Sequence, residues 1–294
     1  MSFIYIFSVC VCVAMRLSLS QIVLVLGGTG QTGRHVVRQL LQEGHTVRAV
    51  VRSKERMLEL LQQQQPEGGQ KSPPLTTLSS LELTEASFLD LPLAQVQSLV
   101  QDCNAVVSCL GHCGTLQGIW GQPRQLVTES IQRLYQAILL DDDDSPPHAQ
   151  HAPTKLILLG TVLVPHPKEP RRTLWERFFL STLGLLLPPH ADNDAAANYL
   201  YHHHAIPSNN NDNDKRLVEW CVVRPNLLVD QDHVTPHRFE ARLQAKFFEG
   251  NYTSSRINVA NSMVKLIQDE QQWETWKYQW PVLFDNNDTE EEES

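Results

Sequence analysis

The apolar run Ile22-Val23-Leu24-Val25-Leu26 passes directly into the turn Gly27-Gly28-Thr29-Gly30-Gln31-Thr32-Gly33. Five consecutive apolar residues of this kind are typical of a strand buried on both faces of a sheet. The glycines repeat as GxGxxG, a spacing that allows a tight turn, a close approach of the backbone to a pyrophosphate, and close packing of the next helix on the strand. The N-terminus of that helix offers unpaired N–H groups to negative charge. The order strand, glycine turn, helix predicts a dinucleotide-binding unit.

Short apolar runs alternate with helix-length segments along the rest of the chain. The first expected helix, Arg34–Glu43, carries its apolar residues on one face and ends before Gly44, a typical C′ glycine. This alternation predicts a parallel sheet with right-handed crossovers. We expect an α/β fold, a single Rossmann-like doubly wound parallel sheet with a small C-terminal lobe on the substrate side. Further strands are expected at Thr46–Val51, Leu81–Leu83, Ala105–Leu110, Lys155–Leu159 and Glu219–Val223, and further helices at Leu93–Gln101 and Leu126–Leu140.

Low-complexity segments mark the surface of the predicted domain. We expect an apolar N-terminal segment at 1–20, an NAD(P)-binding domain with low-complexity loop insertions at 21–284, and an acidic disordered tail at 285–294. The apolar run within the first segment is too short for a bilayer, which needs roughly 20 residues. The segment is a targeting segment, an extra strand, or the result of a mis-set start. Localisation therefore stays open between the cytoplasm and an organelle.

The composition excludes several classes of protein. The 294 residues include 24 basic and 33 acidic side chains, and the formal net charge is −9. A nucleic-acid-binding protein needs a basic stripe, which this chain lacks. Six cysteines without CxxC spacing, and three adjacent histidines at 202–204 that point in different directions on a helix, predict no metal site. The apolar segment Leu174–Leu187 is expected to pack over a substrate cleft rather than on a membrane.

The end of the second expected strand selects the cofactor. An NAD site places an acidic residue there, about 20 residues past the glycine motif, to hold the ribose 2′-hydroxyl. This chain instead has Arg52, nineteen positions beyond Gly33, and its guanidinium can pair with a 2′-phosphate. NADP(H) is therefore preferred, with a solvated strand-end charge as the alternative. All seven residues of the turn are expected to bind the cofactor: Gly27, Gly28, Thr29, Gly30, Gln31, Thr32 and Gly33.

A series of motifs, in order along the chain, resembles a known family. The glycine turn is followed by Val47–Arg52, Phe88–Leu91, Asn104–Gly111, Val222–Pro225 and Ser255–Ala260. Together they resemble the atypical short-chain dehydrogenase/reductase group, and within it the NAD(P)H-binding, NmrA-like branch that includes flavin reductase (biliverdin reductase type B). The likeness covers roughly residues 21–284, insertions aside.

The resemblance implies positions for the two halves of the cofactor. It implies that Asp90 and Leu91 lie beside the adenine, and that Leu110 and Gly111 run under the ribose and pyrophosphate. It also implies that Arg224 faces the nicotinamide half. Two alternatives stay open: Asp90 is a turn-forming residue before Pro92, and Arg224 braces the C-terminal part of the chain.

The catalytic pattern of the larger superfamily is absent. That superfamily uses a Tyr-xxx-Lys pair, whereas Tyr199 is followed four residues later by His203. Thr161 replaces the expected serine after the fifth strand, and His112 follows the fourth strand at the edge where ligands bind. The candidate catalytic residues are therefore Thr161, Tyr199 and His112, with an ordinary loop histidine as the alternative for the last.

These features predict an oxidoreductase that transfers a hydride from NADPH to a small organic acceptor. Related flavin reductases also lack the tyrosine–lysine pair and depend on holding donor and acceptor together. The alternative is a non-catalytic, NADP(H)-responsive sensor of the NmrA-like type, which the missing pair also suits. The acceptor and the oligomeric state are not specified by any pattern in the sequence.

Overall fold

A computed structural model describes residues 20–63, 75–112, 121–143, 152–168, 182, 188–204, 218–242 and 253–285. Its centre is an eight-stranded sheet with the order β3-β2-β1-β4-β5-β6-β10-β8. Strands β1 to β6 and β10 run parallel, and β8 is antiparallel to β10. The strands are β1 (Ile22–Leu26), β2 (Thr46–Val51), β3 (Leu81–Glu85), β4 (Ala105–Ser108), β5 (Thr154–Leu159), β6 (Val218–Pro225), β8 (His237–Glu240) and β10 (Val282–Asp285).

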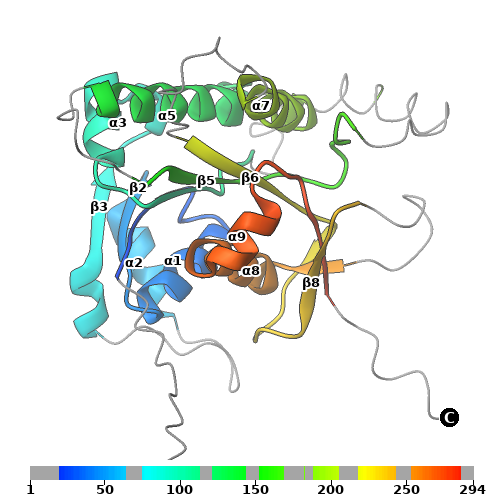
Figure 1. Cartoon of the computed structure of the whole chain (residues 1–294). Helices are drawn as coiled ribbons and strands as arrows, with labels where there is room; N and C mark the ends of the chain where they lie inside the picture. The colour runs from blue at the N-terminus through cyan, green and yellow to red at the C-terminus, as the bar shows by residue number, and fades with distance from the viewer. Residues whose placement is uncertain are drawn as a thin grey trace, which may run out of the picture.

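From β1 to β3 the chain adds strands toward one edge of the sheet, and from β4 to β6 it adds them toward the other edge. This is the arrangement of a doubly wound fold. Helices cover both faces, with α3, α5 and α7 on one side and α1, α8 and α9 on the other (Figure 1). The predicted fold class is confirmed. The helices are α1 (Gly33–Gln42), α2 (Lys54–Gln62), α3 (Leu93–Val100), α5 (Leu126–Asp143), α7 (Pro188–His204), α8 (Arg256–Gln268) and α9 (Glu270–Trp276), with 3₁₀ turns η1 (Leu75–Ser80) and η2 (Phe88–Asp90).

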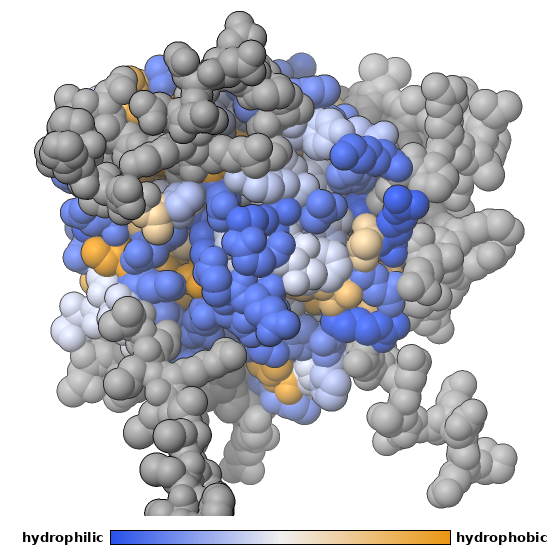
Figure 2. Space-filling view, viewed as in Figure 1, coloured by the Kyte–Doolittle hydropathy of each residue, from blue (hydrophilic) through white to orange (hydrophobic). Residues whose placement is uncertain are grey.

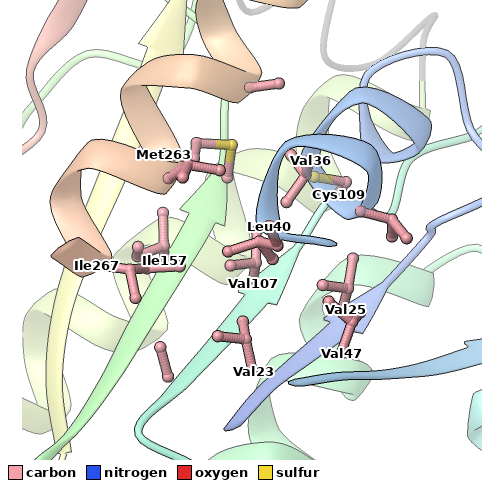
Figure 3. Packing of buried hydrophobic residues seen from close by; sticks show 14 of the residues in the cluster. Val23, Val25, Val36, Leu40, Val47, Val107, Cys109, Ile157, Met263 and Ile267 are labelled. Carbon is pink, nitrogen blue, oxygen red and sulfur yellow. The ribbon is translucent and has the colours of Figure 1, made fainter. Parts of the chain in front are cut away.

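Strand β1 divides the core because its side chains alternate between the two faces of the sheet. Val23 and Val25 belong to the cluster under α1 and α8, and Leu24 and Leu26 belong to the cluster under α5 and α7. Figure 3 shows the first cluster, where residues of α1 and α8 converge on the strands. These four of the five residues of β1 are fully buried, and burial of each contributes about 1.5–3 kcal/mol to stability.

Helix α8 packs directly on α1, although more than two hundred residues separate them in the sequence. The Gln39 side chain donates from Nε2 to the carbonyl oxygen of Ile257, 3.2 Å away, and its Oε1 accepts from Asn261 Nδ2 at 3.2 Å. The C-terminal part of the chain thus completes the core around the first helix.

The predicted C-terminal lobe contains a two-stranded parallel sheet formed by β7 (Leu227–Val229) and β9 (Thr253–Ser255). Asp285, which we expected to open the acidic tail, lies in β10 instead. Its Oδ2 accepts from the backbone N–H of Ser255 at 2.6 Å, and its Oδ1 accepts from Asn258 Nδ2 at 2.8 Å. These bonds satisfy a carboxylate that is 9% exposed, so the described domain extends through residue 285. The remaining tail, the N-terminal segment before Ser20 and almost all of Leu174–Leu187 lie outside the described residues.

None of the helices in the described ranges is long and apolar enough to cross a bilayer. Figure 2 shows that the face over α8 and α9 is mainly hydrophilic, with hydrophobic side chains in small separate areas.

Candidate functional site

The glycine turn is tightly built against its neighbours. Gly27 has a φ of 76°, which favours glycine, and a Cβ there would lie 2.6 Å from the carbonyl oxygen of Cys109. A Cβ on Gly33 would lie 2.2 Å from the carbonyl oxygen of Gly27. The N–H of Gly30 donates to that same oxygen at 2.9 Å. Backbone packing alone therefore requires glycine at positions 27 and 33.

A cavity of about 670 Å³ opens at the carboxyl ends of β1, β2, β3 and β4, with the glycine turn as one wall. The side of the turn that faces the cavity is free of bulky side chains, and α1 begins beside it with no acidic residue in its first turn. Such a wall suits a pyrophosphate, because backbone N–H groups and the helix dipole favour negative charge. Seven of the predicted site residues line this cavity: Gly27, Thr29, Gly30, Arg52, Leu110, Gly111 and His112.

The other predicted residues of the turn do not line the cavity. These residues are Gly28, Gln31, Thr32 and Gly33. A Cβ on Gly28 would contact the side chain of Val37 at 3.3 Å, so this glycine faces α1. Gly33 starts α1 and lies over Gly27. One side of the turn thus faces the cavity, and the other packs against α1.

The end of β2 supplies a cationic corner of the cavity. Arg52, Ser53 and Arg56 line it, and Ser53 caps α2 by accepting from the N–H of Arg56 at 3.1 Å. Helix α2 was not predicted from the sequence, and neither were Ser53 and Arg56 as residues of the cavity wall. Among the described residues that line the cavity none is acidic, and neither guanidinium forms an ion pair with a described carboxylate.

The wall next to β3 differs from the prediction. Ala86, Ser87 and Phe88 line the cavity, whereas Asp90 and Leu91 do not. The 3₁₀ turn η2 accounts for the difference, because it leaves Asp90 exposed and buries Leu91 in the core. The residues that line this wall therefore precede those that the resemblance implied.

One arginine, which no sequence pattern indicated, holds this wall in place. Arg133 of α5 donates to the carbonyl oxygens of Phe88, Leu89 and Leu91. Because each carbonyl belongs to the η2 turn or its end, a single guanidinium satisfies three backbone acceptors and fixes the turn against α5.

His112 lines the opposite side of the cavity and is paired with a buried carboxylate. Its Nε2 lies 2.8 Å from Oδ2 of Asp192 in α7, and the two side chains are 5% and 0% exposed. Asp192 also accepts from the backbone N–H groups of Val127 and Thr128, at 2.8 and 2.9 Å, at the start of α5. The loop after β4 is thus joined to two helices through one carboxylate.

Two of the three predicted catalytic residues and Arg224 lie away from the cavity lining. Thr161 Oγ1 accepts from the backbone N–H of Leu163 at 3.3 Å in a local turn. Arg224 is 1% exposed and donates to the carbonyl oxygens of Trp280 (2.8 Å) and Val164 (3.0 Å), so it braces the C-terminal half of the sheet.

Tyr199 is packed among other aromatic rings. Its ring stacks on His203, with centroids 3.8 Å apart, and meets Tyr135 edge-on at 5.9 Å. Burial, followed by the neighbouring Tyr135, raises the pKa of the Tyr199 phenol. An activated proton donor needs a lowered pKa, so this environment argues against a catalytic phenol at this position.

The described ranges contain no group of three or more His, Cys, Asp or Glu side chains that could hold a metal ion. His202 and His203 are exposed at the end of α7, as expected for a solvated helix terminus. Cys113, which follows His112, lies outside the described residues.

Comparisons with known proteins agree with this geometry. A family model described as NAD(P)H-binding matches residues 27–270. A comparison with curated proteins found no match. Among solved structures, a protein from Lactobacillus casei is 15% identical with a TM-score of 0.60, and the match covers 90% of this chain and 99% of that one.

Two other structures have named activities or ligands. The anaerobilin reductase ChuY from Escherichia coli is 15% identical with a TM-score of 0.53, over 92% of this chain and 99% of that chain. The Candida albicans protein Gre2, in a complex with NADPH, is 13% identical with a TM-score of 0.54, over 90% of this chain and 78% of that chain. At these identities the likeness is one of fold.

Proposed function

The chain belongs to the NAD(P)H-binding family, and on that premise we propose that it is an NADP(H)-dependent oxidoreductase that reduces a small organic acceptor. The observation that carries the proposal is the cationic corner formed by Arg52, Ser53 and Arg56 at the end of β2. Two guanidinium groups and the capped N-terminus of a helix favour a phosphate, whereas an NAD site would place a carboxylate at this point.

The other walls of the cavity would hold the rest of the cofactor. The backbone of Gly27, Thr29 and Gly30 would hold the pyrophosphate, and Phe88 would lie on the adenine side. When bound, NADPH supplies the hydride, and the protein contributes binding and orientation. Catalysis by proximity needs no named acid, which suits a chain whose Tyr199 and Thr161 lie away from the cavity lining.

The resemblance to reductases adds support for an enzyme. ChuY is named as an anaerobilin reductase, and a further neighbour from Streptococcus pneumoniae, 14% identical with a TM-score of 0.54, is named for NADH-flavin reductase activity. Both names favour flat conjugated acceptors as the first compounds to assay.

Two measurements test the proposal. Titrations with NADPH and NADH should give an NADPH dissociation constant at least tenfold lower, a difference of about 1.4 kcal/mol in binding free energy. Equal affinities would refute the preference for NADP(H). Loss of NADPH absorbance in the presence of flavins and quinones should then reveal turnover.

A non-catalytic sensor is the second candidate, and one observation favours it. Neither Tyr199 nor Thr161 lines the described cavity, so no hydroxyl from the predicted catalytic set lies beside the cofactor site. Tight binding that distinguishes NADPH from NADP⁺, without oxidation of NADPH by any acceptor, would support the sensor and refute the oxidoreductase.

A further inference from the structure

The Asp192 carboxylate forms its hydrogen bonds with residues outside its own helix. It lies in α7, yet it accepts from the N–H groups of Val127 and Thr128 at the start of α5 and from the hydroxyl of Thr128 at 2.7 Å. Those N–H groups lack partners within their own helix, so Asp192 acts as an N-terminal cap supplied by another helix. Its position is therefore fixed by three bonds that are independent of His112.

The fixed carboxylate determines which nitrogen of His112 carries a proton. A carboxylate accepts hydrogen bonds, so the 2.8 Å contact requires His112 Nε2 to be the donor. The donating nitrogen and the orientation of the ring are thereby fixed, and its side chain is 95% shielded by protein. An oriented imidazole is more than a loop side chain needs for folding, and this one lines the cofactor cavity.

The order of the strands indicates which part of the ligand His112 faces. Arg52 follows β2, His112 follows β4, and the glycine turn follows β1 between them. In doubly wound folds a dinucleotide lies across this edge with its pyrophosphate at the first helix. If the 2′-phosphate lies at Arg52, the half of the molecule beyond the pyrophosphate extends toward β4 and His112.

We propose that His112 binds the nicotinamide half of NADP(H) and that Asp192 is its positioning residue, an inference that rests on the proposed function. The chemical partner is a hydroxyl or amide group of that half, the groups with which an oriented imidazole forms hydrogen bonds. The competing explanation is that the pair only locks the β4 loop to α5 and α7. The two explanations differ in which ligands a substitution affects.

Measuring the binding of two ligands to full-length variants distinguishes these two explanations. NADPH contains both halves of the dinucleotide, whereas 2′,5′-ADP keeps the adenosine and the 2′-phosphate but lacks the nicotinamide half. His112→Phe should raise the dissociation constant of NADPH about tenfold and leave that of 2′,5′-ADP within about twofold. Asp192→Asn replaces the carboxylate that orients His112 with a neutral amide that has a single acceptor oxygen, so it should weaken NADPH selectively by about threefold.

Two control variants and a stability measurement complete the test. His202→Phe changes an exposed histidine of α7 that does not line the cavity, and should leave both affinities unchanged. Arg52→Met should weaken both ligands. Thermal unfolding of each variant reports any general loss of structure, and if Asp192→Asn does not fold, His112→Phe decides alone.

Each remaining outcome has a definite meaning. Unchanged NADPH affinity in His112→Phe, or equal losses for both ligands, would overturn the inference and leave the proposed function intact. Failure of the unaltered protein to bind either ligand would refute the proposed function, and the inference with it. Selective loss of NADPH binding supports the inference whether or not an acceptor is found.

Discussion

Gly33 lies directly over the backbone of Gly27, so that a Cβ added to Gly33 would approach the Gly27 carbonyl oxygen to 2.2 Å. That oxygen also accepts the hydrogen bond from the N–H of Gly30. The start of α1 and the glycine turn are therefore one rigid unit, and strain at the helix start is transmitted to the wall of the cavity.

Replacement of Gly33 by alanine should be strongly destabilising, because backbone atoms cannot move aside as a flexible side chain can. We expect a loss of about 2–4 kcal/mol in the free energy of unfolding, in the range typical of overpacking combined with backbone displacement. Urea unfolding measures it. Gly111→Ala is the matched control, since a Cβ there meets no atom within 4 Å, and a comparable loss in that variant would contradict the steric explanation.

Arg52→Glu tests the assignment of the 2′-phosphate. The substitution exchanges an attractive charge for a repulsive one at an exposed corner of the cavity, so NADPH affinity should fall by about 100-fold and NADH affinity by less than threefold. Titration calorimetry with both nucleotides checks this. Equal losses for NADPH and NADH would exclude a 2′-phosphate contact at this position, and Lys54→Glu, outside the cavity lining, serves as the charge-matched control.

Arg133 does not line the cavity, yet Arg133→Met should weaken the binding of adenine nucleotides. It leaves the carbonyl oxygens of Phe88, Leu89 and Leu91 without their shared donor, so the η2 wall loses its attachment to α5. We expect about a fivefold rise in the dissociation constant of 2′,5′-ADP and a loss of about 1–3 kcal/mol in unfolding free energy. Arg124→Met, an exposed residue just before α5, should change neither quantity.

The environment of His35 predicts that the stability of the fold depends on pH. Its side chain lies in α1 at 2% exposure, and burial, together with the nearby positive charges of Arg34 and Arg38, lowers its pKa from 6.5 to about 4. The unfolded chain binds a proton at this site more readily than the folded chain. The stability contribution is thus fully present above pH 6.5 and is lost as the pH falls toward 4.

His35→Leu removes this titration. Between pH 7 and pH 4, the stability of the variant relative to the unaltered protein should rise by up to about 3 kcal/mol, and denaturant unfolding at several pH values measures the difference. A constant difference across that range would show that His35 is protonated as easily in the folded protein as in the unfolded one.

The parts of the fold that depend on neighbouring residues were predictable from the sequence. The run Ile22–Leu26, the glycine turn and α1 form one continuous stretch, and their order specifies a strand buried on both sides. The position of Arg52 at the cavity was predictable because the end of the second strand falls at a nearly fixed distance from the motif. Helix α2 was missed, since only Met57 and Leu61 on its mainly polar surface are buried, although Ser53 marked its start.

The residues that support the site were not predictable in the same way. Asp192 meets His112 across 80 positions and Val127 across 65, and Arg133 meets Leu89 across 44. No spacing rule connects such pairs, because only the packing of α7 on α5 and of α5 on η2 brings them together. Asp90 lies outside the cavity lining for a related reason: a single 3₁₀ turn decides which residue of the motif faces the cavity.

The bond from Gln39 to Ile257 has a consequence for biosynthesis. The chain leaves the ribosome from its N-terminus, so α1 emerges 218 positions before the residue whose carbonyl it binds. Until α8 has been translated, Val36 and Leu40 lack part of the apolar cover that they have in the finished protein. Contacts this distant in the chain form late and slow folding, so this part of the core stays exposed while the C-terminal half is synthesised.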